Sequence, residues 1–169
     1  LSIRQIAIED LDQLKQFRCG NTSMESYLNQ EAYLNHCLGE GITKVVEIDD
    51  THQLIAYYTL KCSEFTIDDE NMYSNERKFP CIEISRLAVL SPWQNGQNGI
   101  RIGTHLLGYI LNFIKDVLAK EIGCKFIVIH AVHEMIKWYE DFGFEAPDGK
   151  IPNQYGTVFM LLDITDKEE

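Results

Sequence analysis

The feature that most constrains the fold is an amphipathic helix placed between two apolar, strand-like runs. From about residue 102 the apolar residues recur at helical spacing, and Gly123 is expected to end this helix. Residues 81–90 before the helix are expected to form a strand, and residues 126–132 after it a buried strand. Strands and helices that alternate in this way predict an α/β fold with a mixed sheet. The apolar side of the helix consists of Leu106, Leu107, Ile110, Ile114, Val117 and Leu118.

The rest of the chain adds shorter elements to this frame. No internal repeat and no Pro/Ser linker divides the sequence, so we expect a single domain over residues 1–169. A capping box of Thr22 and Glu25 is expected to open the second helix, and residues 64–80 are expected to form a long loop. The remaining expected elements are a strand over 2–8, helices over 9–17, 22–38 and 134–142, a hairpin over 43–48 and 53–61, and a final strand over 157–164.

Charge and cysteine content narrow the classes of function. The 26 acidic and 15 basic residues give a net charge of −11, which disfavours long-range attraction to nucleic acid and favours cationic substrates. The five cysteines form no CxxC pair, a pattern typical of reduced thiols in the cytoplasm. Because no apolar run approaches the ~20 residues of a membrane span, no membrane association is expected.

The junction between the strand at 81–90 and the long helix is the strongest candidate for a binding site. A helix N-terminus presents free backbone N–H groups and the positive end of the helix dipole, and nearby glycines allow a ligand to approach closely. Such a junction suits phosphate groups. The sequence lacks the Gly-Lys-Ser/Thr of a Walker loop and the Gly-x-Gly-x-x-Gly of a dinucleotide-binding fold. An ordinary connection between a strand and a helix is the alternative.

Two motifs, in the expected order, resemble those of the GNAT N-acetyltransferases. The first runs from Glu83-Ile84-Ser85-Arg86-Leu87-Ala88-Val89 through Trp93-Gln94 to Gly99-Ile100-Arg101-Ile102-Gly103-Thr104. The second is Trp138-Tyr139-Glu140-Asp141-Phe142-Gly143-Phe144. Together with Phe17-Arg18-Cys19-Gly20 and Ala56-Tyr57-Tyr58-Thr59-Leu60, they resemble the branch that contains acetyltransferase toxins of toxin–antitoxin pairs.

This resemblance implies a mixed, mostly antiparallel central sheet with flanking helices, and acetyl-CoA as cosubstrate without a metal. The loop after Trp93 is about four residues longer than the family pattern, so either Gln94 is the motif glutamine or Asn98 takes its place. We favour the second register, because Gly103 then continues into the helix. The cofactor-binding residues that the resemblance implies are Leu87, Ala88, Val89, Asn98, Gly99, Ile100, Arg101, Ile102, Gly103 and Thr104.

The resemblance also implies a reaction in which an amine attacks a thioester, and it suggests two catalytic groups. Tyr139 matches the general-acid tyrosine of the family, and Glu83 matches a glutamate that acts as a base through water. A core aromatic residue and a solvated strand glutamate are the respective alternatives. His130 and His133 are three residues apart across a strand end, a spacing that does not predict a metal site.

The acceptor is left open among amines. We expect a small-molecule or peptide amine, because the acidic charge disfavours tRNA, although a basic groove assembled from Lys15, Arg18, Lys61, Arg86 and Lys137 would favour it. The alternatives are a toxin-type enzyme that acts on aminoacyl-tRNA and a non-catalytic module that binds acyl-CoA or a protein partner. The toxin-like branch adds a homodimer and an antitoxin as candidate partners.

Overall fold

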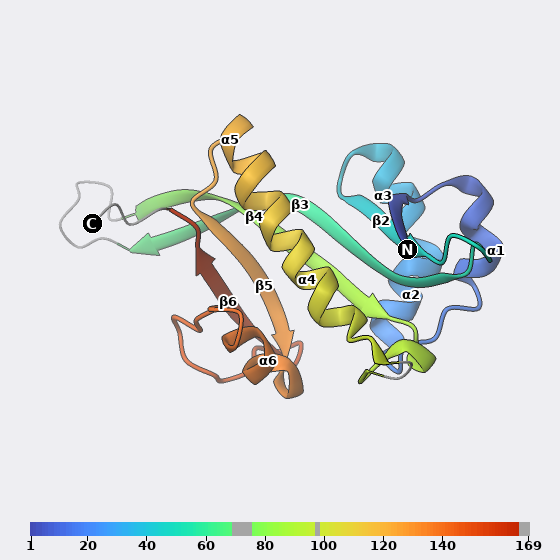
Figure 1. Ribbon diagram of the computed structural model, residues 1–169. Helices are drawn as coiled ribbons and strands as arrows, with labels where there is room; N and C mark the ends of the chain where they lie inside the picture. The colour runs from blue at the N-terminus through green and yellow to red at the C-terminus, as the bar shows by residue number, and fades with distance from the viewer. Residues whose placement is uncertain (69–75, 97–98, 166–169) are drawn as a thin grey trace. The chain divides into compact units, whose positions relative to one another are not determined.

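The computed structural model describes residues 1–68, 76–96 and 99–165 (Figure 1). Its strands form one six-stranded sheet in the order β1-β2-β3-β4-β5-β6. The pairs β1–β2, β2–β3 and β5–β6 are antiparallel, whereas β4 pairs with β5 in parallel. The predicted α/β class with a mixed, mostly antiparallel sheet is therefore confirmed. The elements in chain order are β1 (Ser2–Gln5), η1 (Ile8–Asp10), α1 (Leu11–Leu14), α2 (Thr22–Gln30), α3 (Ala32–Leu38), β2 (Ile42–Glu47), β3 (Leu54–Asp68), β4 (Glu76–Val89), η2 (Ser91–Trp93), α4 (Ile102–Phe113), the π-helical turn η4 (Ile114–Leu118), α5 (Ala119–Glu121), β5 (Phe126–Val132), η5 (His133–Met135), α6 (Ile136–Glu140) and β6 (Thr157–Asp163).

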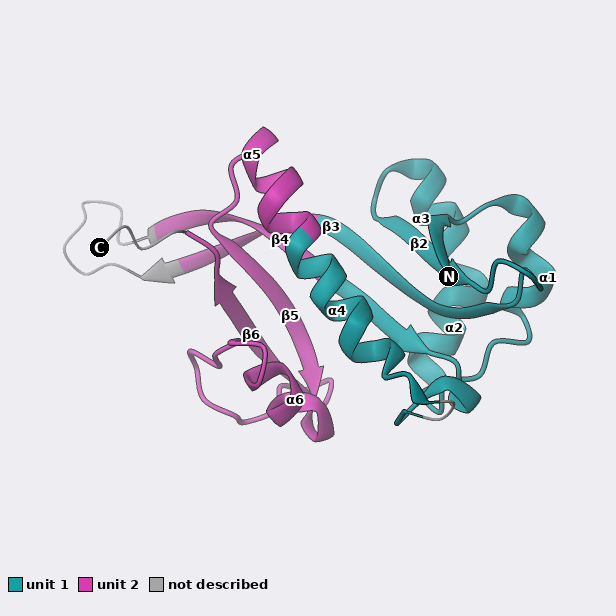
Figure 2. Cartoon of the chain, in the orientation of Figure 1, with its two compact units in different colours: residues 1–61, 85–112 teal, residues 62–84, 113–169 magenta. Residues whose placement is uncertain are grey.

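The chain divides into two compact units, coloured separately in Figure 2. Unit 1 contains residues 1–61 and 85–112, and unit 2 contains residues 62–84 and 113–169. The strands β3 and β4 each run from one unit into the other. The expectation of a single domain stays a prediction.

The core of unit 1 lies between the sheet and the N-terminal helices. Tyr57 of β3 is fully buried, and its ring meets Phe17 edge-on at 5.6 Å between centroids. Its hydroxyl donates to the carbonyl of Met24 on α2 at 2.7 Å, so this large polar residue is buried with its hydrogen bond satisfied. The same cluster includes Ala88 near the end of β4, which fixes that end of the strand against the helices.

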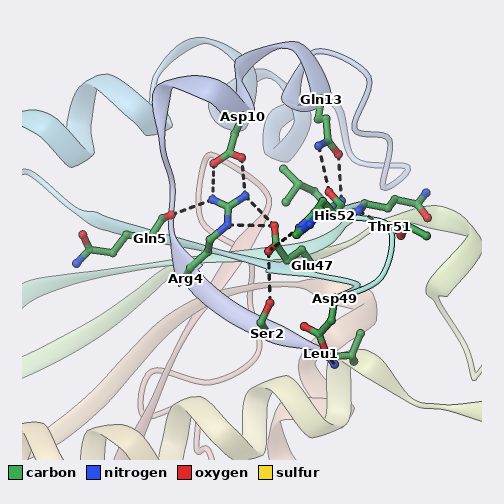
Figure 3. Close-up of polar contacts among 12 residues, drawn as sticks. Leu1, Ser2, Arg4, Gln5, Asp10, Gln13, Glu47, Asp49, Thr51 and His52 are labelled. Atoms are coloured by element: carbon green, nitrogen blue, oxygen red, sulfur yellow. Dashed lines mark hydrogen bonds and ion pairs between the residues drawn. The ribbon is translucent and has the colours of Figure 1, made fainter.

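A network of charged groups joins β1, η1 and β2 in unit 1 (Figure 3). The guanidinium of Arg4 donates to both carboxylate oxygens of Asp10 at 2.8 and 2.7 Å, and to Glu47 at 3.0 and 2.8 Å. Both carboxylates are buried, and His52 Nδ1 lies 3.4 Å from Glu47. Each buried acid thus has a cationic partner, as the cost of burying a charge requires.

The expectation of a long loop over residues 64–80 is wrong for residues 64–68 and 76–80, while residues 69–75 lie outside the described residues. β3 continues to Asp68 and β4 begins at Glu76. The cause is a cluster of aromatic rings in unit 2: Phe65 stacks on Phe159 at 5.2 Å, and both Phe65 and Phe79 meet Phe126 edge-on. Aromatic residues far along the chain therefore pack against Phe65 and Phe79, which lie in a stretch of largely polar sequence.

The expected helix over residues 22–38 is divided in two. Glu31 has φ −120°, outside the helical region, and it separates α2 from α3. The cap also differs from the expected Thr22, because the side chain of Asn21 accepts the N–H of Met24 at 3.1 Å. Glu25 reaches back as expected, but to the N–H groups of Cys19 and Gly20.

Candidate active site

The end of β4 presents the segment that the sequence assigns to the pantetheine arm. Ala88 points into the core of unit 1, whereas Leu87 and Val89 are half-buried, and successive side chains of a strand point to opposite faces. The carbonyl of Val89 accepts a hydrogen bond from Gln94 Nε2 at 2.7 Å. One face of this segment is thus fixed by packing, while Leu87 and Val89 lie on the other.

Gln94 holds the long loop in place by its side chain. Its Nε2 donates to Val89 O and also to Cys19 O at 2.8 Å, and Ser91 donates its N–H to Arg18 O at 2.8 Å. The amide of Gln94 thus bonds to the protein's own carbonyls, while α4 begins at Ile102; the register in which Asn98 and Gly103 hold the motif stays a prediction. Of these two residues, Asn98 lies outside the described residues.

The start of α4 has the geometry of an anion site. The backbone N–H of His105 donates to Arg101 O at 3.1 Å, the first hydrogen bond of the helix. The N–H groups of Ile102, Gly103 and Thr104 therefore lie in the first turn and have no acceptor within the helix. Arg101 and Thr104 are exposed and Gly103 is half-buried. Gly99 and Ile100 are exposed as well, and Gly99 has φ +77°, which favours glycine. These amides and the cationic Arg101 suit a phosphate group.

Tyr139 lies on α6 in unit 2, within an aromatic cluster. Its ring meets Trp138 at 4.9 Å and Phe144 at 5.7 Å between centroids. Gly143 has φ +90°, and the turn there lets the buried Phe144 donate its N–H to Tyr139 O. Burial raises the pKa of Tyr139 to about 12, so its phenol is protonated at neutral pH. The second motif thus places a neutral hydroxyl donor on a rigid support.

Glu83 lies on β4 in unit 2, opposite Val128 in the parallel pair with β5. Its side chain is half-buried. Tyr139 belongs to the same unit, whereas the residues assigned to acetyl-CoA belong to unit 1. The proposed roles of Tyr139 and Glu83 stay predictions.

The structure gives little support to the other sites considered. Among residues 1–68, 76–96 and 99–165, no group of three or more His, Cys, Asp or Glu side chains is placed to hold a metal ion. Over the same ranges no helix is long and apolar enough to cross a membrane. In the postulated basic groove, Lys15 is paired with Asp12 and Lys137 with Asp141, which reduces their attraction for phosphates.

Comparison with known proteins finds acetyltransferase toxins among the relatives of this chain. No family model matches the sequence. The chain is 29% identical over 145 residues to a tRNA-acetylating toxin of Mycobacterium tuberculosis, and this match covers 82% of the chain and 81% of the toxin. It also superposes with a TM-score of 0.70 on the toxin–antitoxin complex AtaTR bound with acetyl-CoA, at 18% identity and with 95% and 92% of the two chains covered. The fold is that of the GNAT acetyltransferase toxins.

A further structure is relevant to the acceptor. The toxin AtaT complexed with acetyl-methionyl-tRNA superposes with a TM-score of 0.72, at 18% identity, over 94% of this chain and 92% of AtaT. The resemblance to the toxin branch, predicted from the sequence, is confirmed by these relatives. They also bear out the predicted enzyme class, an acetyltransferase that uses acetyl-CoA.

Proposed function

We propose that this protein transfers the acetyl group of acetyl-CoA to the α-amino group of an aminoacyl-tRNA. The observation that carries the proposal is the similarity to a tRNA-acetylating toxin along 82% of the chain, joined to the acetyltransferase fold. Acetyl-CoA is assigned to the end of β4 and the start of α4. An antitoxin is the corresponding protein partner, since similar toxins are solved as complexes with one.

The reaction needs a proton donor more than it needs a base. The amine nitrogen attacks the thioester carbonyl, the C–S bond breaks, and the thiolate of coenzyme A leaves. Its conjugate acid has a pKa of about 8.5, below the value of about 12 of Tyr139. Tyr139 therefore acts first as a hydrogen-bond donor to the developing thiolate. When it passes its proton to the sulfur, the tyrosinate takes up the proton that the attacking nitrogen loses as the amide forms.

The proposed acceptor explains why a dedicated base is dispensable. An α-amino group has a pKa of about 7.7–8.0, so a sizeable fraction is neutral near pH 7.5, whereas an alkylamine of pKa ~10.4 is almost fully protonated. A base adds little to the first reaction and much to the second. Glu83 is thus the proposed water-mediated base only for alkylamines.

Small cationic amines are a second candidate, favoured by one specific observation. The net charge of −11 attracts cations and repels the phosphates that supply most of the affinity in tRNA binding. The proposal of aminoacyl-tRNA nevertheless ranks first, because similarity in sequence bears on the acceptor more directly than total charge does.

The test supplies labelled acetyl-CoA with either charged tRNA or a panel of polyamines and lysine peptides, at 0.15 M salt. We expect label in the tRNA fraction that is released by mild alkali, which cleaves the aminoacyl ester. Incorporation into the cationic amines alone would establish the second candidate. Release of coenzyme A with neither acceptor, despite measurable acetyl-CoA binding, would favour the non-catalytic module.

A further inference from the structure

Arg86 occupies an unusual position in unit 1. It lies on β4 two residues before Ala88, and its side chain reaches α2, where the guanidinium carbon stands 4.5 Å from the ring centroid of Tyr27. Tyr27 is buried at 7% exposure. Nη1 of Arg86 donates to the carbonyl of Ser85 at 2.7 Å. The guanidinium thus lies over an aromatic ring and is held by a hydrogen bond to its own strand.

Apart from the Tyr27 ring and Ser85 O, the described residues give this guanidinium no partner. Nε is shielded from solvent and has no hydrogen-bond acceptor among the described residues, and Nη1 is the only nitrogen for which the described part of the chain provides one. Within residues 1–68, 76–96 and 99–165, no carboxylate forms an ion pair with Arg86. Arg4, the other half-buried arginine, has two carboxylates bound to it.

An incompletely paired, half-buried charge is costly to the folded protein. The chain has 26 acidic residues and places two of them around Arg4, yet none of the acidic residues that the structure describes forms an ion pair with Arg86. The missing counter-charge is therefore best supplied by a ligand. The planar fork of arginine matches the oxygen atoms of phosphate groups.

We infer that Arg86 binds a phosphate of the acceptor, on the nucleotide that carries the aminoacyl ester. The inference rests on the proposed function, and it identifies a residue that selects the acceptor. The side chain lies against α2, whereas the amides assigned to the phosphates of acetyl-CoA begin α4. An uncompensated cation at this place also repels polyamines, so it favours a phosphate-bearing acceptor in an otherwise acidic protein.

Binding can be tested without activity by NMR of the arginine Nε–H signals. The Arg86 signal is assigned by its absence in Arg86→Lys, and the wild-type protein is titrated separately with adenosine 5′-monophosphate and with coenzyme A. We expect a saturable shift of this signal with the nucleotide, with or without coenzyme A present. A signal that responds to neither titrant overturns the inference, and a response to coenzyme A alone would assign Arg86 to the cosubstrate instead.

Steady-state kinetics provide a second test of the role of Arg86. In Arg86→Gln and Arg86→Lys the KM for aminoacyl-tRNA should rise about 10–100-fold, the range for loss of charged hydrogen bonds, with kcat within threefold of wild type. The KM for an amino-acid methyl ester, which has the same amine and no phosphate, should be unchanged. Equal losses for both acceptors would reveal a structural role and overturn the inference.

A matched control is available in unit 2. The guanidinium carbon of Arg77 stands 4.8 Å from the ring centroid of Phe79, and Arg77 is exposed. Arg77→Gln makes the same change of charge and disrupts the same type of contact, and it should leave both KM values unchanged. If no acceptor is acetylated at all, the proposed function fails, while the NMR titration still decides whether Arg86 binds phosphate.

Discussion

Tyr139 is a residue whose chemistry depends on its surroundings. Aromatic rings pack against its half-buried side chain, and burial raises its pKa to about 12. A phenol in this state donates a hydrogen bond over the whole pH range in which amines react. Without the ring contacts, the same tyrosine would titrate near 10.

Replacing this hydroxyl gives the first prediction. Tyr139→Phe should lower kcat by about 10²–10⁴, the range for loss of a general acid, and should leave the dissociation constant of acetyl-CoA near that of wild type. Release of coenzyme A measures the first quantity and calorimetry the second. Tyr155→Phe, at a residue that is 80% exposed, serves as the control. If the Tyr139→Phe protein is fully active, Tyr139 only packs against its neighbours and is not the general acid.

Glu83 gives a prediction that separates two kinds of acceptor. With an α-amino acceptor, Glu83→Gln should change kcat/KM by less than about threefold near pH 7.5, because much of that amine is already neutral. With an alkylamine the loss should be about 10²-fold or more, as expected when a general base is removed. The measurement is a pH–rate profile for each acceptor. Equal losses of kcat/KM with both acceptors would mean that Glu83 stabilises the fold or contacts the thioester, and does not act as a base.

At the scale of elements, the loop that begins at Ser91 and the first turn of α4 act together as the proposed phosphate site. Gln94 fixes the loop to Val89 and Cys19, and the first amides of the turn that begins at Ile102 have no acceptor within the helix. The longer loop therefore does not disturb the start of α4, because the side chain of Gln94 anchors the loop. The helix begins where the sequence predicts.

A substitution in this turn separates helix stability from cofactor binding. Gly103→Asp should weaken acetyl-CoA binding at least about tenfold, because a carboxylate would then face the phosphates. The melting temperature of the free protein should hold or rise, since an acidic residue in the first turn favours the helix dipole. Calorimetry and thermal melting measure the two effects. Gly108→Asp, later in the same helix, should leave affinity unchanged, and an unaltered affinity in Gly103→Asp would place the phosphates elsewhere.

At the scale of the whole molecule, stability in acid should depend on the network around Arg4. Burial raises the pKa of Asp10, but the bonds from Arg4 and from the N–H of Ala7 outweigh it, and the pKa lies below its usual value. Arg4 also lowers the pKa of Glu47. Since both folded-state pKa values are depressed, the stabilisation is present above about pH 4 and is lost as the pH falls through the folded values.

Arg4→Met should therefore change both the size and the pH dependence of the unfolding free energy. Two buried carboxylates would lose their partner, at a cost of about 2–3 kcal/mol, below the range for fully buried pairs because Arg4 is 38% exposed. Their pKa values should then rise, so acid should weaken the variant less than wild type. Urea unfolding between pH 3 and pH 7 tests this, with Arg77→Met as control. Parallel pH profiles in the variant and wild type would contradict it.

The sequence by itself determined the elements whose signal is local. Apolar spacing located α4, and the apolar run at 126–132 coincides with β5. The two motifs indicated the family resemblance and selected Tyr139, because glycine and aromatic residues at fixed spacing mark a turn and its packing. These signals lie within about 20 residues of chain, where periodicity and turn chemistry decide the conformation.

Only the tertiary structure decided the features that depend on distant partners. The extension of β3 and β4 requires Phe126 and Phe159, and Gln94 anchors its loop to a carbonyl 75 residues away. The raised pKa of Tyr139 and the unsatisfied Nε of Arg86 likewise depend on what surrounds each side chain. Burial and ion pairing are properties of the neighbours that folding brings together, and no local pattern in the sequence encodes them.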